Sequence, residues 1–505
     1  MLPAAYSPPI PRPFSLIGEQ VSFITTRLDF HGPTASVFQM NDCIAFRTGI
    51  VTVTLHCPLF TDERNLSPVH TFGTGSGGLM SDDGWTWRSG AVRPGGGVAP
   101  DALKIGDRYL ITYSGNYPGT QGKTHGIATT MWATTLNPDS VDYSKEELVA
   151  WAGADDDCYC IDPALLLDPT TGRLWMSYGT YFGAIRIVEL DPKTAKRIEK
   201  SEPVDIAIDC EATALMYHNG WYYLLGTHGT CCDGTNSTYN IVCGRSREVT
   251  GPYVDNVGRD MLQGGGKMVL SAGNRVTGPG HFGHYVEEEG CEKMSCHFEA
   301  DFERSGKSVL GIRSLLWKND WPVAADPFKE GTFEIESERR GYALELAVDF
   351  VRINAGRGFG NASTPNESIP NQMLSDVIGD WPKGNIDVRL GDYMFRPHQR
   401  WTVTAVGDKG GYLGAPYYKI TIEGSNRALA ATADGELTAV PQYTGAPEQL
   451  WRIEQLIDGT YRIINEKVPG KEGKQFALVC IGDCSLTLGQ YDFNDVNCKW
   501  NFRDR

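Results

Sequence analysis

The 505-residue sequence has no long apolar run. None of its hydrophobic stretches approaches the 18 residues that a membrane-spanning helix needs, so no membrane partner is predicted. It also has no excess of positive charge. Asp and Glu number 62 against 46 Lys and Arg, and the net charge of −16 argues against binding the phosphates of a nucleic acid. The heptad-like periodicity of amphipathic helices is nearly absent, which argues against a helical fold.

Turn-forming and aromatic residues are abundant instead. The 58 glycines, 28 prolines and 10% aromatic residues indicate a turn-rich, mostly β protein, and the length predicts two or three domains. From about residue 70 to 325, short strands alternate with turn residues every 8 to 12 positions. Residues 1–19 begin with a proline-rich stretch that has no hydrophobic signal core, and we expect them to be a disordered lead.

The 13 cysteines cannot all pair within one chain, and their spacing matches no structural zinc site. Cysteines that lie close in sequence include the pairs Cys231–Cys232, Cys291–Cys296 and Cys480–Cys484. In an oxidising compartment the second and third pairs are close enough to form disulfides. The adjacent pair is interpreted as buried packing or as a strained vicinal disulfide, and not as a catalytic group.

Two carboxylates stand directly ahead of apolar strand-like runs. Asp162 precedes residues 164–167, Glu211 precedes residues 213–217, and 49 residues separate the two acids. That spacing is too long for a hairpin and fits one blade of a β-propeller. A third acidic motif, at Asp101, lies 61 residues before Asp162. Propeller blades whose first strands each begin near a common axis would produce this spacing. Burying a carboxylate there is energetically costly unless it has a function or an interaction partner.

The last third of the chain repeats one plan three times. Each repeat has an aromatic-x-Ile strand, an Ala-Leu step and a closing tryptophan, and the tryptophans Trp401, Trp451 and Trp500 are 50 and 49 residues apart. This pattern resembles the ricin-type β-trefoil, whose Gln-x-Trp signature is kept in the first two repeats and changed to Cys498 in the third. The resemblance predicts a β-trefoil over residues 326–505 with a polar insertion at 351–382.

Sugar-binding members of the ricin type carry an aspartate soon after the Ala-Leu step. Other residues stand at those positions: Glu345, Ala430 and Val479. A structural or cleft-shaping appendage is therefore at least as well supported as a sugar-binding module.

Several motifs of the middle region occur in a characteristic order. They are Ile161–Pro169, Leu174–Gly183, Glu189–Thr194, Cys231–Tyr239, Gly244–Ser246, Thr250–Asp255 and Gly278–His281. Together they resemble the arabinanases of glycoside hydrolase family 43, which are five-bladed β-propellers. The resemblance covers roughly residues 71–323. It predicts an all-β chain with a five-bladed propeller at 20–325 followed by the β-trefoil.

The resemblance also implies roles for single residues. Glu211 would be the general acid of an inverting hydrolase, with a raised pKa, and Asp162 would be the anionic partner that tunes this pKa. Asn236, Phe182 and Asp101 are the predicted substrate-binding residues, although core packing is nearly as good an interpretation of Phe182. The implied substrate is α-1,5-linked L-arabinan or its oligosaccharides. Such a polymeric substrate suggests a secreted protein.

His281 falls where the family keeps an imidazole at the propeller axis, often beside a metal ion bound through water. A calcium or other cation held in this way near His281 is one expectation, and no cofactor is the other. A lone histidine is often a satisfied core residue, and one imidazole would hold calcium loosely because calcium prefers oxygen ligands.

The third acid of the family, the general base, belongs in a His-Asp-Pro tripeptide that opens the first blade. Two tripeptides keep the flanking His and Pro but lack the central Asp: His31-Gly32-Pro33 and His56-Cys57-Pro58. Three explanations remain open. The segment from about 15 to 70 could be a shifted reading of a normal blade, Asp29 could supply the base, or the propeller could bind arabinan without cutting it. An exo-acting arabinofuranosidase or xylosidase is a further alternative.

Overall fold

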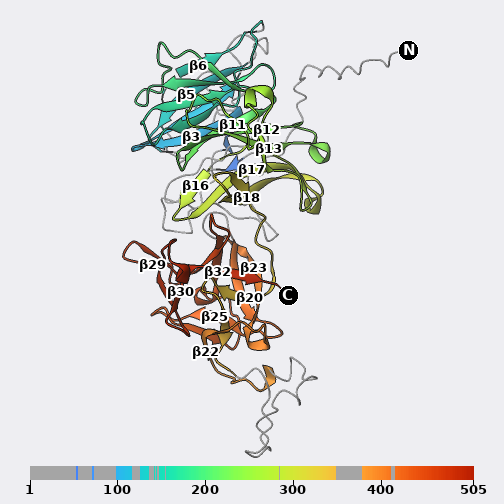
Figure 1. Ribbon diagram of the computed structural model, residues 1–505, viewed down its shortest axis with the longest axis vertical. Helices are drawn as coiled ribbons and strands as arrows, with labels where there is room; N and C mark the ends of the chain where they lie inside the picture. Colours follow the sequence, from blue (N-terminus) through green and yellow to red (C-terminus); the bar gives the residue numbers. More distant parts are fainter. Residues whose placement is uncertain are drawn as a thin grey trace, which may run out of the picture.

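The computed structural model describes residues 53–54, 71–72, 98–115, 126–135, 142, 144, 147–153, 155–283, 285–348, 378–410 and 416–504. These residues form β-strands joined by turns and short 3-10 helices. Figure 1 shows two bodies stacked along the long axis of the molecule, with the strands up to β19 in one and those from β20 onward in the other. None of the described helices is long and apolar enough to cross a membrane.

The first body is built from separate antiparallel sheets. Three of them have four strands in chain order, and each reads from its inner strand to its outer edge. The first sheet consists of β3 (Val98–Ile105), β4 (Arg108–Gly115), β5 (Ile127–Ala133) and β6 (Glu147–Trp151). The second consists of β7 (Ala164–Leu167), β8 (Leu174–Tyr178), β9 (Ile185–Leu190) and β10 (Val204–Ala207). The third consists of β11 (Glu211–His218), β12 (Trp221–His228), β13 (Asn240–Ser246) and β14 (Lys267–Leu270).

A fourth sheet has five strands and lies next to the second body (Figure 1). Its strands are β15 (Val276–Gly280), β16 (Tyr285–Glu288), β17 (Cys291–Asp301), β18 (Lys307–Trp317) and β19 (Pro322–Ala324). The two short strands β1 (Val53–Thr54) and β2 (Thr71–Phe72) pair with each other in a further sheet. The predicted rhythm of acidic motifs is correct, because Asp101, Asp162 and Glu211 lie in or just before β3, β7 and β11.

The second body is one ten-stranded sheet that closes on itself through the pairing of β24 with β27, together with a three-stranded sheet. Alternation places its apolar side chains inside. In β22, for example, Ile386, Val388 and Leu390 are buried while Asp387 and Arg389 are not. Its strands are β20 (Gly331–Ser337), β21 (Tyr342–Leu346), β22 (Ile386–Asp392), β23 (Arg400–Gly410), β24 (Pro416–Ile422), β25 (Ala428–Ala431), β26 (Leu437–Val440), β27 (Trp451–Gln455), β28 (Tyr461–Asn465), β29 (Gly470–Lys471), β30 (Lys474–Ile481), β31 (Ser485–Gln490) and β32 (Trp500–Arg503).

The threefold sequence repeat is a threefold structural repeat. Trp401, Trp451 and Trp500 are fully buried. Each indole N–H donates to the carbonyl oxygen of the leucine in its own Ala-Leu step, at 2.8 Å for Leu344, 3.0 Å for Leu429 and 2.9 Å for Leu478. The predicted fold class, an all-β propeller followed by a β-trefoil, is confirmed.

A turn of the last propeller sheet is inserted into the trefoil. The turn Glu289–Gly290 joins β16 to β17, and its two carbonyl oxygens accept hydrogen bonds from the Tyr491 hydroxyl (2.9 Å) and the Ile457 amide (2.9 Å). Gly290 has φ +81°, and a Cβ atom there would lie 2.2 Å from the ring of Phe493. Glycine therefore fits this turn both for its backbone conformation and for the close approach of the trefoil.

Beside this turn, charged side chains from both bodies are buried together. Lys293 of β17 interacts electrostatically with Glu454 of the trefoil, and Glu454 forms ion pairs with Arg452 (2.9 Å) and Arg462 (2.7 Å). Burial alone would raise the pKa of Glu454, but the three cations hold it at about 2. The propeller and the trefoil thus share a packed, ion-paired junction.

The structure decides between the two interpretations of the adjacent cysteines. Cys231 and Cys232 form a vicinal disulfide, and since Cys231 is half-buried and Cys232 exposed they are not core packing. Neither of the other two predicted pairs forms a disulfide. Cys291 and Cys296 lie five positions apart on β17, so their side chains project from opposite faces of the strand. The predicted lead at 1–19 and most of the insertion at 351–382 lie outside the described residues.

Candidate active site

Asp162 and Glu211 lie side by side at the starts of neighbouring inner strands. Asp162, with φ +53°, ends the connection into β7, and Glu211 is the first residue of β11. An Oδ of Asp162 accepts the N–H of Ala212 at 3.1 Å, and the Asp162 amide donates to Ser114 Oγ at 3.3 Å. These two bonds tie the connection to the strands on either side and bring two acids from distant parts of the chain together.

Glu211 has the electrostatic surroundings of a proton donor. Burial raises its pKa, and the carboxylates of Asp162 and Glu299 raise it further, so that the pKa reaches about 8. The Tyr239 hydroxyl donates to one oxygen of Glu211 and the Thr180 hydroxyl to the other, at 3.4 Å. A carboxyl group that keeps its proton at neutral pH beside a second carboxylate can serve as a general acid.

The loop that leads to Tyr239 is held by a buried carboxylate. Glu299 of β17 accepts the backbone N–H groups of Cys232, Asp233 and Gly234 at 3.1, 3.2 and 3.3 Å. Burial would raise the pKa of Glu299, but His297, at 3.4 Å, and the backbone donors lower it, so it stays ionised. Glu299 therefore holds Cys232 of the vicinal disulfide and the start of the short helix η1 (Gly234–Asn236), on the loop that leads to Tyr239.

The predicted substrate-binding residues lie in different settings. Asn236 is exposed at the end of η1, and Phe182 is 45% exposed with its ring 4.7 Å from that of Tyr159. Core packing therefore does not explain Phe182. Asp101 is buried, and its two oxygens accept the amides of Ala102 and Leu165, both at 2.9 Å. This carboxylate joins β3 to β7, and its role in binding sugar stays a prediction.

His281 follows β15 at the inner end of the strand. Its side chain is buried, its φ is +50°, and its amide donates to Thr227 Oγ1 at 2.7 Å. Within the described residues no three His, Cys, Asp or Glu side chains form a group that could hold a metal ion. Both candidate slots for the general base, Gly32 and Cys57, lie outside the described part of the chain, as does Asp29.

Sequence reasoning found the two acids but missed the residues that control them. Tyr239 and Thr180 lie within the recognised motifs Cys231–Tyr239 and Leu174–Gly183, and were given no role there. Glu299 has no local signal at all, because it acts on a loop 67 residues earlier in the chain.

A proton-donating carboxyl group beside a second carboxylate, at the inner strands of a β-propeller, is the arrangement expected of an acid–base glycosidase. Comparison with known families agrees. The model of glycosyl hydrolases family 43 matches residues 76–322, and that of the ricin-type β-trefoil lectin domain-like family matches residues 397–471. The chain belongs to glycosyl hydrolase family 43 and is a glycosidase.

Curated relatives cover most of the propeller. The chain is 32% identical to an extracellular endo-α-(1→5)-L-arabinanase of Bacillus subtilis over 228 residues, which is 44% of this chain and 67% of the relative. It is 30% identical to an extracellular exo-α-(1→5)-L-arabinofuranosidase of Cellvibrio japonicus over 315 residues, 55% of this chain and 89% of the relative.

Solved structures with similar sequences include two arabinanases. The α-L-arabinanase of Cellvibrio cellulosa is 28% identical, with a TM-score of 0.42 over 45% of this chain and 77% of the other. An exo-1,5-α-L-arabinanase from a bovine ruminal metagenomic library is 25% identical, with a TM-score of 0.48 over 59% of this chain and 100% of the other.

Proposed function

We propose that this protein hydrolyses α-1,5-linked L-arabinan, or oligosaccharides derived from it, with inversion at the anomeric carbon. The observation that carries the proposal is the half-buried Glu211 carboxyl beside Asp162, whose pKa is raised to about 8 by desolvation and by the charge of Asp162. The names of the relatives support the substrate, since both the endo-acting and the exo-acting relative act on α-(1→5)-linked L-arabinose. Their description as extracellular supports secretion.

In this mechanism Glu211 donates its proton to the leaving glycosidic oxygen. Burial and then the negative charge of Asp162 keep the acid protonated, and Tyr239 and Thr180 orient the two carboxyl oxygens. Inversion also needs a carboxylate about 6.5–9.5 Å from the acid to activate water. The candidate positions for that base, Asp29, Gly32 and Cys57, lie outside the described residues.

The substrate would be held by groups that flank the acids. The Asn236 amide on η1 is suited to hydrogen bonds with sugar hydroxyls, and the exposed ring of Phe182 to contact with a furanose face. Asp101 and a cation bound through water near His281 are further parts of the proposal. The proton transfer from Glu211 is derived without them.

Replacing Glu211 with Gln tests the proposal. Glutamine keeps the size of the side chain but cannot give up a proton, so kcat on linear arabinan should fall by about 10²–10⁴-fold. Reducing-end release measures the rate, and the melting temperature confirms that the variant is folded. Glu248→Gln, a change at an exposed glutamate, is the matched control and should keep full activity. Sugar release by Glu211→Gln at the parent rate would remove this residue from the mechanism.

Two alternatives are separated by the same assay. Binding without cleavage predicts retardation in an arabinan-containing gel with no new reducing ends. Exo action, which the Cellvibrio japonicus relative makes a specific candidate, predicts short products from the first minutes of reaction, whereas endo action predicts a rapid fall in chain length.

A further inference from the structure

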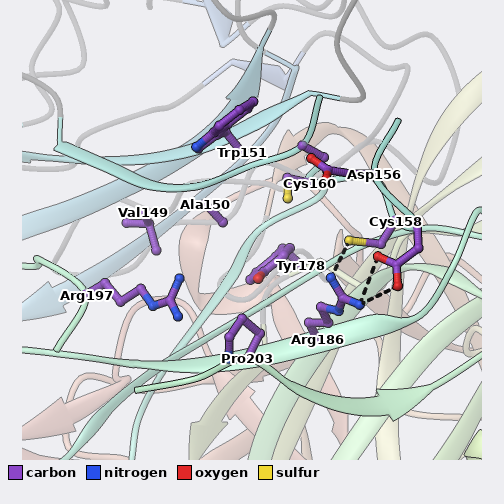
Figure 2. Close-up of a pocket in the computed structure, with 12 residues that line it drawn as sticks. Val149, Ala150, Trp151, Asp156, Cys158, Cys160, Tyr178, Arg186, Arg197 and Pro203 are labelled. Carbon is purple, nitrogen blue, oxygen red and sulfur yellow. Dashed lines mark hydrogen bonds and ion pairs between the residues drawn. The ribbon is translucent and has the colours of Figure 1, made fainter. Parts of the chain in front are cut away.

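A cavity opens on the propeller where two blades meet. It has a volume of about 230 Å³ and lies between the end of β6, the connection from β6 to β7, and the outer strands of the next blade. Figure 2 shows Trp151 and Asp156 on one side of this cavity, Arg186 and Pro203 on the other, and Tyr178 between them. We call it the Trp151 pocket.

The Trp151 pocket lies on the same end of the propeller as the paired acids. The strand β6 ends at Trp151, and the chain then runs through residues 152–161 directly to Asp162. Along this connection the Tyr159 amide donates to the Phe182 carbonyl at 3.1 Å, and Gly183 packs closely against Asp157 and Cys158. One continuous segment therefore links the wall of the pocket to the acid-bearing centre.

The walls of the Trp151 pocket combine a flat apolar surface with polar groups of both signs. The Trp151 side chain is 55% exposed, the second most exposed of the large apolar residues that the structure describes. Exposing a tryptophan to this degree costs stability and is typical of binding surfaces. Planar aromatic rings suit the C–H faces of sugars, and nearby polar groups suit their hydroxyls.

Charge in the Trp151 pocket is balanced, which argues against an ionic ligand. Arg186 is engaged by Asp205 at 2.8 Å, by Asp157 at 3.2 Å and by the Cys158 sulfur at 2.7 Å. Arg197 donates to the Ser201 carbonyl at 2.8 Å. With both guanidinium groups already engaged, an anion gains little from them, and a neutral hydroxylated ligand fits better.

The two cysteines of the pocket, Cys158 and Cys160, do not form a reactive or metal-binding site. Burial raises the pKa of the Cys160 thiol to about 12, and burial likewise raises that of Cys158 against the opposing effect of Arg186. Both sulfurs thus remain protonated at neutral pH, and a protonated thiol is a weak nucleophile and a poor metal ligand.

We propose that the Trp151 pocket is a secondary binding site for the arabinan chain, in which a pentose unit stacks on the Trp151 indole. The pocket would hold part of a polymer while another part occupies the catalytic centre, and it would raise affinity for long chains without taking part in bond cleavage. This proposal rests on the proposed function for its ligand.

The test compares variants of the full-length chain in the Glu211→Gln background, where the polymer is not degraded. Trp151→Ala should weaken retardation in a linear-arabinan gel by about tenfold in apparent Kd, and Trp151→Phe should restore much of it because it keeps a ring. Val257→Ala, which truncates an exposed apolar residue outside the pocket, should not change retardation. Melting temperatures check that all variants are folded.

The active enzyme supplies the second readout. With Glu211 intact, Trp151→Ala should raise KM for the polymer and leave kcat on arabinotriose unchanged. Equal retardation of Trp151→Ala and its parent, while the intact enzyme still releases sugar from arabinan, would overturn the pocket proposal and leave the proposed function standing. An intact enzyme that neither cleaves nor binds arabinan would overturn both.

Discussion

At the scale of single residues, the chemistry depends on the pKa of one carboxyl group. The pKa of Glu211 is raised to about 8, first by burial and second by the charge of Asp162. Below that pH the group is protonated and can donate; above it the group is ionised and the acid is lost. The rate should therefore fall as the pH rises through about 8.

The contribution of Asp162 can be measured by removing its charge. In Asp162→Asn the pKa of Glu211 should fall but stay above its ordinary value, since burial still raises it, and the alkaline limb of the kcat/KM profile should move to lower pH. The profile needs to be followed from about pH 5 to 9. An alkaline limb that does not move would show that the charge of Asp162 does not raise the pKa of Glu211.

The same scale shows what sequence could and could not provide. Asp162 and Glu211 were predictable because each stands at the start of an apolar strand within a recognisable motif. Glu299 was not, because its contacts with Cys232 and Gly234 exist only after β17 has folded against the loop. Local patterns carry local information, and long-range contacts are invisible to them.

At the scale of elements, the trefoil depends on its three buried tryptophans. Trp451→Phe would leave the Leu429 carbonyl without its donor and open a small void, so unfolding free energy should drop by about 2–4 kcal/mol. Urea denaturation measures this. Tyr393→Phe, at a ring that is 44% exposed, is the control and should change little. A Trp451→Phe variant as stable as the parent would mean that the indole hydrogen bond is not needed.

Strand positions were largely predictable from alternation and turn residues. The strand-like runs at 164–167 and 213–217 form β7, with those limits, and most of β11. The cysteine pairs were not predictable from spacing. Proximity in sequence suggested Cys291–Cys296, whereas the alternation of side chains along β17 separates them.

At the scale of the whole molecule, the junction joins two domains through buried charge. Glu454→Gln would leave Arg452, Arg462 and Lys293 buried without their counter-charge, and should destabilise the protein by about 3–5 kcal/mol. The stability that Glu454 contributes should be complete above pH 4.5 and decline as the pH falls toward its folded pKa of about 2.

Chemical denaturation at pH 7 measures the loss, and Asp483→Asn is the control. Asp483 is 95% exposed and lies 3.7 Å from Arg339, so its removal should leave the denaturation midpoint in place. Because Lys293 belongs to the propeller, the loss in Glu454→Gln should be recorded by probes in both domains. A loss confined to the trefoil would contradict the shared junction.

This junction could not be predicted from local sequence patterns. The propeller and the trefoil were each readable from their own repeats, but Lys293 and Glu454 are ordinary strand residues until the two bodies dock.

Gly290 sets how closely the two bodies approach, and it does so by what it leaves out. The ring of Phe493 occupies the space in which any other residue would carry its first side-chain carbon. A single methyl group at this position would act as a wedge, forcing either the turn or the ring to give way. The lack of a Cβ atom at position 290 thus sets the distance between the propeller and the trefoil, and substitution of this glycine by any other residue would disturb their contact.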